Sequence, residues 1–150
     1  MRDDGDRGES LLELLVAIAI MGIAAVAIFG ALLTSVKVSD YHRKQTSAGA
    51  DVHNLAEKLT QYAATGYAPC ATTAMYSPAT VGYVTPAGFT ATTTAVLYWI
   101  GGVWTAAGCT ASTDSGVQQV AIQVSSNDGR ATEYLRVVVR KPCGPGSTCA

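Results

Sequence analysis

The chain has 150 residues, the size of one ordinary domain, and it carries few charges. Hydrophobic residues make up 49% of it and Asp, Glu, Lys and Arg only 14%, against about 25% in a typical soluble domain. This composition argues against an intrinsically disordered chain. The net charge of -1 argues against a globally basic, nucleic-acid-collecting surface. The charges are unevenly placed, since none occurs in residues 14–36 or 59–113.

The first uncharged tract predicts a membrane-spanning helix. Residues 14–33 are all apolar or glycine, and about 20 such residues in a helix cross the hydrocarbon core of a bilayer. A cleaved secretory signal has a basic start, a shorter apolar core and a cleavage site behind that core. Here the hydrophilic residues 1–8 come before the apolar run. We therefore expect the apolar helix to remain in the mature protein.

One carboxylate, Glu13, lies at the start of this apolar run. A charge at the end of a span costs less desolvation free energy than one at the centre, so Glu13 can lie at the headgroup level without a partner. The alternative is that Glu13 pairs with a specific cation. The residues around it favour the second interpretation.

The amino-terminal motif GESLLE, residues 8–13, followed by the apolar run, resembles the signature of type IV prepilins and type II secretion pseudopilins. In that family a prepilin peptidase cuts after a glycine and methylates the new amino terminus. A glutamate five residues into the mature chain is kept within the hydrophobic helix. The resemblance implies cleavage between Gly8 and Glu9, N-methylation at Glu9, and a role in assembly for Glu13.

The chain departs from the pattern of major pilins at two positions. Many major pilins begin the mature chain with Phe and carry a proline within the helix, where this chain has Glu9 and Gly30. Both departures favour a minor pilin-like subunit. Gly22 stands where the family also has glycine, and a helical glycine costs about 1 kcal/mol relative to Ala. Gly22 and Gly30 are therefore candidates for helix flexibility, although glycine is also common in membrane helices generally.

A second helical pattern follows the apolar run. Positions spaced alternately by three and four form a mostly apolar stripe: Val38, Tyr41, Gln45, Ala48, Val52, Leu55, Leu59 and Tyr62. No proline intervenes before Pro69, so one helix is predicted over residues 10–64, with this stripe packed on a globular head. His42 and His53 lie about three turns apart on such a helix. We therefore expect no metal site there.

The remaining sequence predicts a small antiparallel sheet. Residues 59–113 are rich in Ala, Thr and Gly and are predicted to form a long loop with a strand at 95–100. Alternating apolar residues at 120–124 and 135–139, separated by turn residues, predict a hairpin. Three strands covered on one face by the helix make an α+β head. The resemblance implies the same pilin-like layout, a long amino-terminal helix packed by its second half on a sheet.

All four cysteines follow the apolar run: Cys70, Cys109, Cys143 and Cys149. This placement is typical of an oxidising, extracytoplasmic side, and four cysteines allow three pairings. Because each pair then brackets a continuous segment, we favour Cys70–Cys109 and Cys143–Cys149. Basic residues flank both ends of the apolar run, so charge alone does not set its orientation. The cysteines place the head outside the cytoplasm.

The sequence contains no recognisable enzyme motif. It has no nucleophile elbow, no phosphate-binding glycine loop and no paired carboxylates in an evident cleft. Asp114, Asp128 and Glu133 are scattered, and we interpret them as solubilising loop residues. The prediction is that the protein is not an enzyme and needs no cofactor.

Two groups of residues raise the alternative of a binding surface. Tyr98, Trp99 and Trp104 could form an exposed platform, but strand aromatics more often belong to a core. Arg136 and Arg140 share a strand face, where a contact with nucleic acid is possible but a solvated face is favoured.

These observations predict a cleaved leader (1–8), a transmembrane and filament-core helix (9–36), its amphipathic continuation (37–64) and a globular head (65–150). The predicted function is a structural subunit of a type IV pilus-like or pseudopilus filament, made as a single-pass precursor in the cytoplasmic membrane. The partners implied by the resemblance are like or related pilin subunits, prepilin peptidase, and an assembly platform with its ATPase. The alternatives are a monomeric membrane-anchored extracytoplasmic binding module and an anchored hydrolase. The choice between pilus and pseudopilus stays open.

Overall fold

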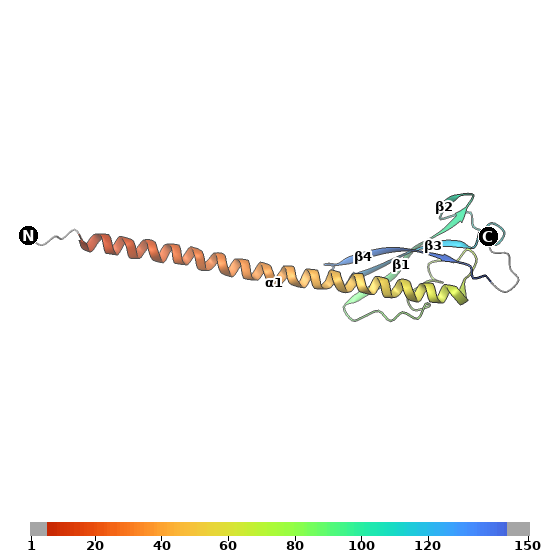
Figure 1. Ribbon diagram of the computed structural model, residues 1–150, viewed down its shortest axis with the longest axis horizontal. Helices are drawn as coiled ribbons and strands as arrows, with labels where there is room; N and C mark the ends of the chain where they lie inside the picture. Colours follow the sequence, from red (N-terminus) through yellow and green to blue (C-terminus); the bar gives the residue numbers. More distant parts are fainter. Residues whose placement is uncertain (1–5, 144–150) are drawn as a thin grey trace, which may run out of the picture. The chain divides into compact units, whose positions relative to one another are not determined.

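The computed structural model describes residues 6–143, with side chains from Leu11 onward. One helix, α1 (Asp6–Gly66), is followed by four strands: β1 (Phe89–Ile100), β2 (Val103–Thr105), β3 (Val117–Ser126) and β4 (Thr132–Arg140) (Figure 1). The helix therefore extends slightly beyond the predicted residues 10–64 at both ends. The chain divides into two units, Met1–Asp40 and Tyr41–Ala150, and the helix runs through the boundary between them.

The first unit holds the apolar part of α1. Every described side chain from residue 11 to residue 39 is exposed, and Leu15 and Ile23 expose 65% and 73% of their surface. The helix is long and apolar enough there to cross a membrane. Apolar surface on this scale is unfavourable in water, so it marks contact with lipid or with other protein.

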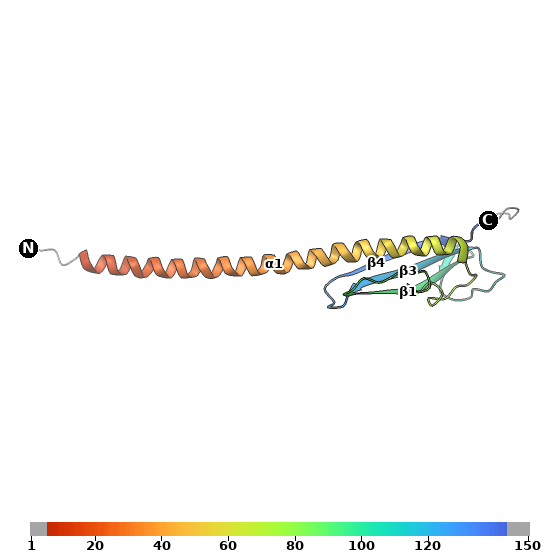
Figure 2. The same ribbon diagram turned by 90° about the horizontal axis from the view of Figure 1, so that it is seen from below.

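The second unit is an α+β head in which residues 41–66 of α1 pack on the sheet (Figure 2). The predicted stripe is confirmed where it meets the sheet, because Ala48, Val52, Leu55 and Leu59 are all buried. Their spacing of three and four residues keeps them on one face of the helix. The stripe begins later than predicted, since Tyr41 is exposed.

The sheet has the order β2-β1-β3-β4, and all neighbouring strands are antiparallel. The predicted hairpin is β3 with β4, and its register places Val120 opposite Val137 and Ile122 opposite Leu135. The predicted strand at 95–100 is the second half of β1, which begins at Phe89. The Thr- and Ala-rich first half belongs to the sheet because it pairs with β3, with an irregularity between Thr93 and Ala95.

The sequence does not predict β2, although it predicts the other three strands at least in part. This strand is only three residues long and follows a tight turn in which Gly101 and Gly102 have φ angles of 59° and 84°. These left-handed conformations favour glycine. The turn brings Trp104 opposite Trp99. A strand of three residues is too short to show a pattern of alternating apolar and polar residues, which is why the sequence does not reveal it.

The core lies between α1 and the inner face of the sheet. It is formed by the helix stripe, by the apolar inner residues of β1, β3 and β4, and by residues of the loop that joins α1 to β1. That loop places Tyr76 completely inside. Gln118 is also completely buried, because the alternation of β3 turns it to the same side as Val120 and Ile122.

Candidate functional site

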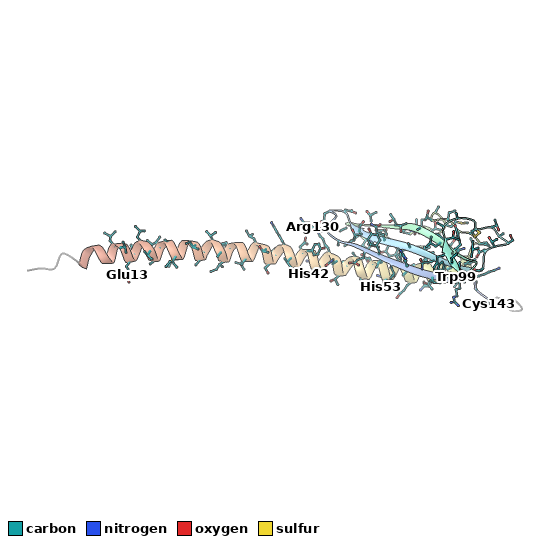
Figure 3. The ribbon with its side chains drawn as sticks, turned by 90° about the horizontal axis from the view of Figure 1, so that it is seen from above. Glu13, His42, His53, Trp99, Arg130 and Cys143 are labelled. Carbon is teal, nitrogen blue, oxygen red and sulfur yellow. A yellow bond between two sulfur atoms is a disulfide. The ribbon has the colours of Figure 1, made fainter. Side chains whose placement is uncertain are left out.

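The predicted processing and assembly residues all lie on α1. Gly8 and Glu9 fall within its first turns, where the side chains lie outside the described residues. Glu13 is exposed on the amino-terminal part of the helix (Figure 3). Gly22 and Gly30 have no neighbouring atom within 4 Å of the position that a Cβ would occupy. Close packing among the residues that the structure describes therefore does not require glycine at either position.

Glu13 is an isolated charge on an apolar helix. It is the only ionisable residue between Leu11 and Val36, and within residues 6–143 no ion pair is found for it. A carboxylate in hydrocarbon is unfavourable unless a cation compensates it. A compensating charge for Glu13 therefore has to come from the headgroup region, from the amino-terminal residues that are not described, or from another molecule.

The head contains a disulfide between Cys70 and Cys109, the pairing that the sequence analysis favours. Cys70 has a φ of 53°, which is a left-handed conformation and unfavourable for a side-chain-bearing residue. Cys143 is disulfide-bonded as well. Its predicted pairing with Cys149 stays a prediction, because Cys149 lies outside the described residues.

Asp114 organises the loops next to this disulfide, so its interpretation as a solubilising loop residue was wrong. Its carboxylate accepts hydrogen bonds from the Tyr67 hydroxyl (2.8 Å), the Cys70 amide (2.8 Å), the Gly116 amide (2.7 Å) and the Gln118 side-chain amide (3.4 Å). Partial burial alone would raise the pKa of Asp114. The four donors outweigh burial and lower it, because hydrogen bonds to a carboxylate favour its charged form.

The network continues into the core through Gln118. Its side-chain amide donates to the Ala68 carbonyl at 2.9 Å, and its oxygen accepts from the Tyr76 hydroxyl at 3.1 Å. Burial, followed by the charge of Asp114, raises the pKa of Tyr76 to about 12. Tyr76 therefore stays protonated, and the buried polar groups satisfy one another.

Asp128 and Glu133 differ in their surroundings. Asp128 accepts a hydrogen bond from Lys44, which connects α1 to the turn between β3 and β4. The Lys44 bond is the main cause that holds the pKa of Asp128 well below its usual range. Asp128 is thus more than a solubilising group, although it is surface-exposed. Glu133 lies half-buried on β4, opposite Val124.

Among the described residues, one group resembles a metal site and one cavity resembles a cleft. Ligand atoms of Cys70, Cys109 and Asp114 lie within 4.8 Å of one another, but the two sulfurs are joined in the disulfide and offer no thiolate. His42 and His53 are exposed at separate places on α1 (Figure 3). A cavity of about 330 Å³ between the end of α1 and β4 has Arg140 and Lys141 as its charged lining residues. It offers no carboxylate, histidine or thiol as a general acid or base.

The aromatic residues divide between the two faces of the sheet. Tyr98 is partly buried against the core and donates a hydrogen bond to the Ala71 carbonyl at 3.0 Å. Trp99 points to the opposite face, exposes 38% of its surface and contacts Trp104 edge to face, with ring centroids 5.1 Å apart. The expectation that strand aromatics belong to the core is therefore confirmed for Tyr98 and wrong for Trp99.

Comparison with known proteins identifies the amino-terminal segment. Residues 4–35 match the family model of the prokaryotic N-terminal methylation motif, which is the prepilin-type signature. No curated protein and no solved structure gives a significant match. The chain therefore carries the signature of a type IV pilin-like or pseudopilin-like precursor, and the matched segment ends before the head begins.

Proposed function

We propose that this protein is a structural subunit of a type IV pilus-like or pseudopilus filament. The observation that carries the proposal is the coincidence of the methylation motif at residues 4–35 with a helical segment whose described side chains, from residue 11 to residue 39, are all exposed. Such a helix suits two successive environments, first the bilayer and then a bundle of like helices. The proposed mechanism is assembly rather than catalysis.

In this mechanism, processing creates the partner of Glu13. A prepilin peptidase cuts between Gly8 and Glu9 and methylates the new amino terminus, which keeps its positive charge. In the filament this amine pairs with the Glu13 carboxylate of a neighbouring subunit. Two opposite charges attract strongly in a low-dielectric core, and each would be costly there alone.

The helix and the head have different tasks in this proposal. The precursor lies in the cytoplasmic membrane as a single-pass protein, and the Cys70–Cys109 disulfide supports a head outside the cytoplasm. Extraction and addition of each subunit require an assembly platform with its ATPase. Gly22 and Gly30 lower the free-energy cost of local helix bending during this transfer. The mature start at Glu9 and the lack of a helix proline support a minor subunit.

The test of processing is an intact-mass measurement with amino-terminal sequencing. Expressed with a prepilin peptidase, the wild-type chain is expected to begin at a methylated Glu9, and Gly8→Val is expected to stay at full length. Gly5→Val places the same side chain elsewhere in the leader and should be processed normally. A wild-type chain that keeps Met1, or that is cut behind the apolar run, would overturn the proposal.

The alternative is a monomeric membrane-anchored binding module. The exposed Trp99 on the face of the sheet that points away from the core favours this candidate. A methylated Glu9 has no use in a simple anchor, and a filament fraction sheared from cells would not contain an anchored monomer. Amino-terminal sequencing, together with analysis of the sheared filament fraction, therefore separates the two functions.

A further inference from the structure

The side of the sheet that faces away from α1, here called the outer face, combines exposed aromatic rings with arginines. Its side chains come from alternate positions of the strands, as the burial pattern and the register show. Among them are Trp99 on β1 with Trp104 on β2, Gln119 and Gln123 on β3, and Tyr134, Arg136 and Arg140 on β4. Ala95 and Ala121 lie in register with Arg136, so the side chains beside this arginine on the outer face are small.

Two aromatic rings of the outer face are exposed to solvent. Trp99 is 38% exposed and Tyr134 is 68% exposed. Trp99 is held against Trp104, which fixes its ring and reduces the entropy that a ligand would have to remove. Exposed, positioned tryptophan is characteristic of surfaces that bind a partner.

All charges on the described outer face are positive. Arg136 pairs in register with Ala121, and Arg140 with Val117, so the alternation along β4 places both residues on this face. Glu133 carries the single carboxylate of the four strands, and the alternation along β4 places it on the face that α1 covers. Trp99 and Arg140 are separated by β3, a distance of about 10 Å across two strand spacings. Arg130, next to Asp128, is at the opposite end of the sheet from Trp99 (Figure 3).

We propose that the outer face binds single-stranded nucleic acid. Bases stack on Trp99 and Tyr134, while Arg136 and Arg140 contact the phosphates between them. Aromatic rings together with cations on an open surface are the combination that binds unpaired bases and their backbone. Charge complementarity favours an anionic ligand, and the stacking surfaces favour one with exposed planar rings over a duplex, whose bases are already stacked.

The position of this face also favours an external ligand over a second copy of the chain. This step rests on the proposed function. If subunits assemble through the apolar part of α1, the outer face, which α1 does not cover, is not used by those contacts. Repetition of the face along a filament then supplies many weak sites to one strand, which raises the overall affinity.

The test uses the full chain in non-ionic detergent and a fluorescein-labelled oligothymidylate, with anisotropy measured at several salt concentrations. The wild type is expected to bind, with the logarithm of the affinity falling as salt rises. Trp99→Ala should weaken binding about tenfold, because stacking of a base on one ring is lost. The double change Arg136→Gln with Arg140→Gln should reduce the salt slope by about 1.4, or ~0.7 for each lost phosphate contact.

Matched controls keep the inference testable if one variant misfolds. Lys58→Gln removes one positive charge from an exposed position of α1 and should leave binding unchanged. Tyr134→Ala removes a ring that is far more exposed than Trp99, so it tests stacking without risk to the core.

Three results would overturn the inference: no binding of oligothymidylate at low salt, tighter binding of a duplex or of an anionic polysaccharide, or equal losses in Lys58→Gln and the outer-face variants. Loss of self-association in Trp99→Ala without any oligonucleotide binding would show that the face contacts another copy instead. Because the assay uses unassembled chains, its outcome is independent of whether the protein forms filaments.

Discussion

Asp114 connects segments that lie far apart in the sequence. Its carboxylate accepts hydrogen bonds from the Tyr67 hydroxyl and the Cys70 amide, which come before it in the sequence. It also accepts hydrogen bonds from the Gly116 amide and the Gln118 side chain, which come after it. Among residues 6–143, Cys70 is the one non-glycine residue with a left-handed φ. The hydrogen bond from its amide helps to hold this conformation and thus the geometry of the disulfide loop.

We expect Asp114→Ala to lower the free energy of unfolding of the head by about 2 kcal/mol, because it leaves partly buried donors without an acceptor. Urea unfolding of the full chain in detergent, followed by the fluorescence of Trp99 and Trp104, measures this. Ser112→Ala, an exposed change in the same loop, is the control. Equal stability of Asp114→Ala and the wild type would contradict the role given to the carboxylate.

The lowered pKa of Asp114 predicts an acid dependence. The unfolded-state pKa of an Asp is about 3.9, so the stabilisation is fully present above that pH and is lost as pH falls through the lower folded-state value. Asp128 has a lowered pKa too, so the wild type alone does not isolate Asp114. The difference in stability between the wild type and Asp114→Asn should therefore narrow below about pH 4. A difference that stays constant with pH would contradict this.

The role of Asp114 could not be read from the sequence because its partners are 44 and 47 positions away at Cys70 and Tyr67. One local signal was present. Asp114 lies two residues before Gly116 and bonds to its amide, a turn for which an Asp is suited. The inward orientation of Gln118 could also be predicted from the sequence, because Gln118 lies on the same face of β3 as Val120 and Ile122.

At the scale of elements, the Cys70–Cys109 disulfide closes a loop across the least regular part of the head. The bond joins residues 39 positions apart in the chain. A cross-link of that span stabilises a fold by about 4 kcal/mol on the chain-entropy model. The double change Cys70→Ser with Cys109→Ser should lower the free energy of unfolding by that order, as measured by urea unfolding. If the double change lowers the free energy of unfolding by less than about 1 kcal/mol, packing alone orders this segment.

We expect residues 41–66 of α1 to be the element that contributes most to the stability of the sheet. Leu59 is completely buried in the core, so Leu59→Ala is expected to cost about 3 kcal/mol through lost burial and a residual cavity. Leu15→Ala makes the same change at an exposed position of the same helix and should not alter the unfolding of the head. Equal effects of the two changes in urea unfolding would contradict the division of the helix into a buried and an unburied part.

Elements with their own periodicity were predictable, and elements defined by pairing were not. The helix stripe and the β3–β4 hairpin repeat with the periods of helix and strand. The first half of β1, with Thr90, Thr92 and Thr94, has no apolar alternation, so the sequence predicts a loop there. It is a strand because β3 supplies its hydrogen-bond partners. The exposure of Trp99 depends on which face α1 covers, and this information is absent from the strand itself.

At the scale of the whole molecule, the low charge content has separate causes in the two units. In the first unit, residues 14–36 lack charge, which suits lipid and, in our proposal, a filament core. In the head, the uncharged residues 59–113 contribute the joining loop, β1 and β2, which are stabilised by hydrogen bonds and the disulfide instead of ion pairs. Glu13 lies directly before this tract and is the only ionisable residue between Leu11 and Val36, so it provides the sharpest test of the proposed assembly.

We expect Glu13→Gln to be inserted and processed but assembled poorly. The amide cannot neutralise the amine of a neighbouring Glu9, and an unpaired charge in a low-dielectric core costs about 3 kcal/mol, or roughly a hundredfold in association. The filament fraction sheared from cells, compared with the membrane fraction, measures this, and intact mass verifies that the variant begins at Glu9. Glu57→Gln, at an exposed position of the head, is the control and should assemble normally. Undiminished filaments from Glu13→Gln would remove the charge pair from the mechanism, while processing after Gly8 would remain to be judged on the mass measurement alone.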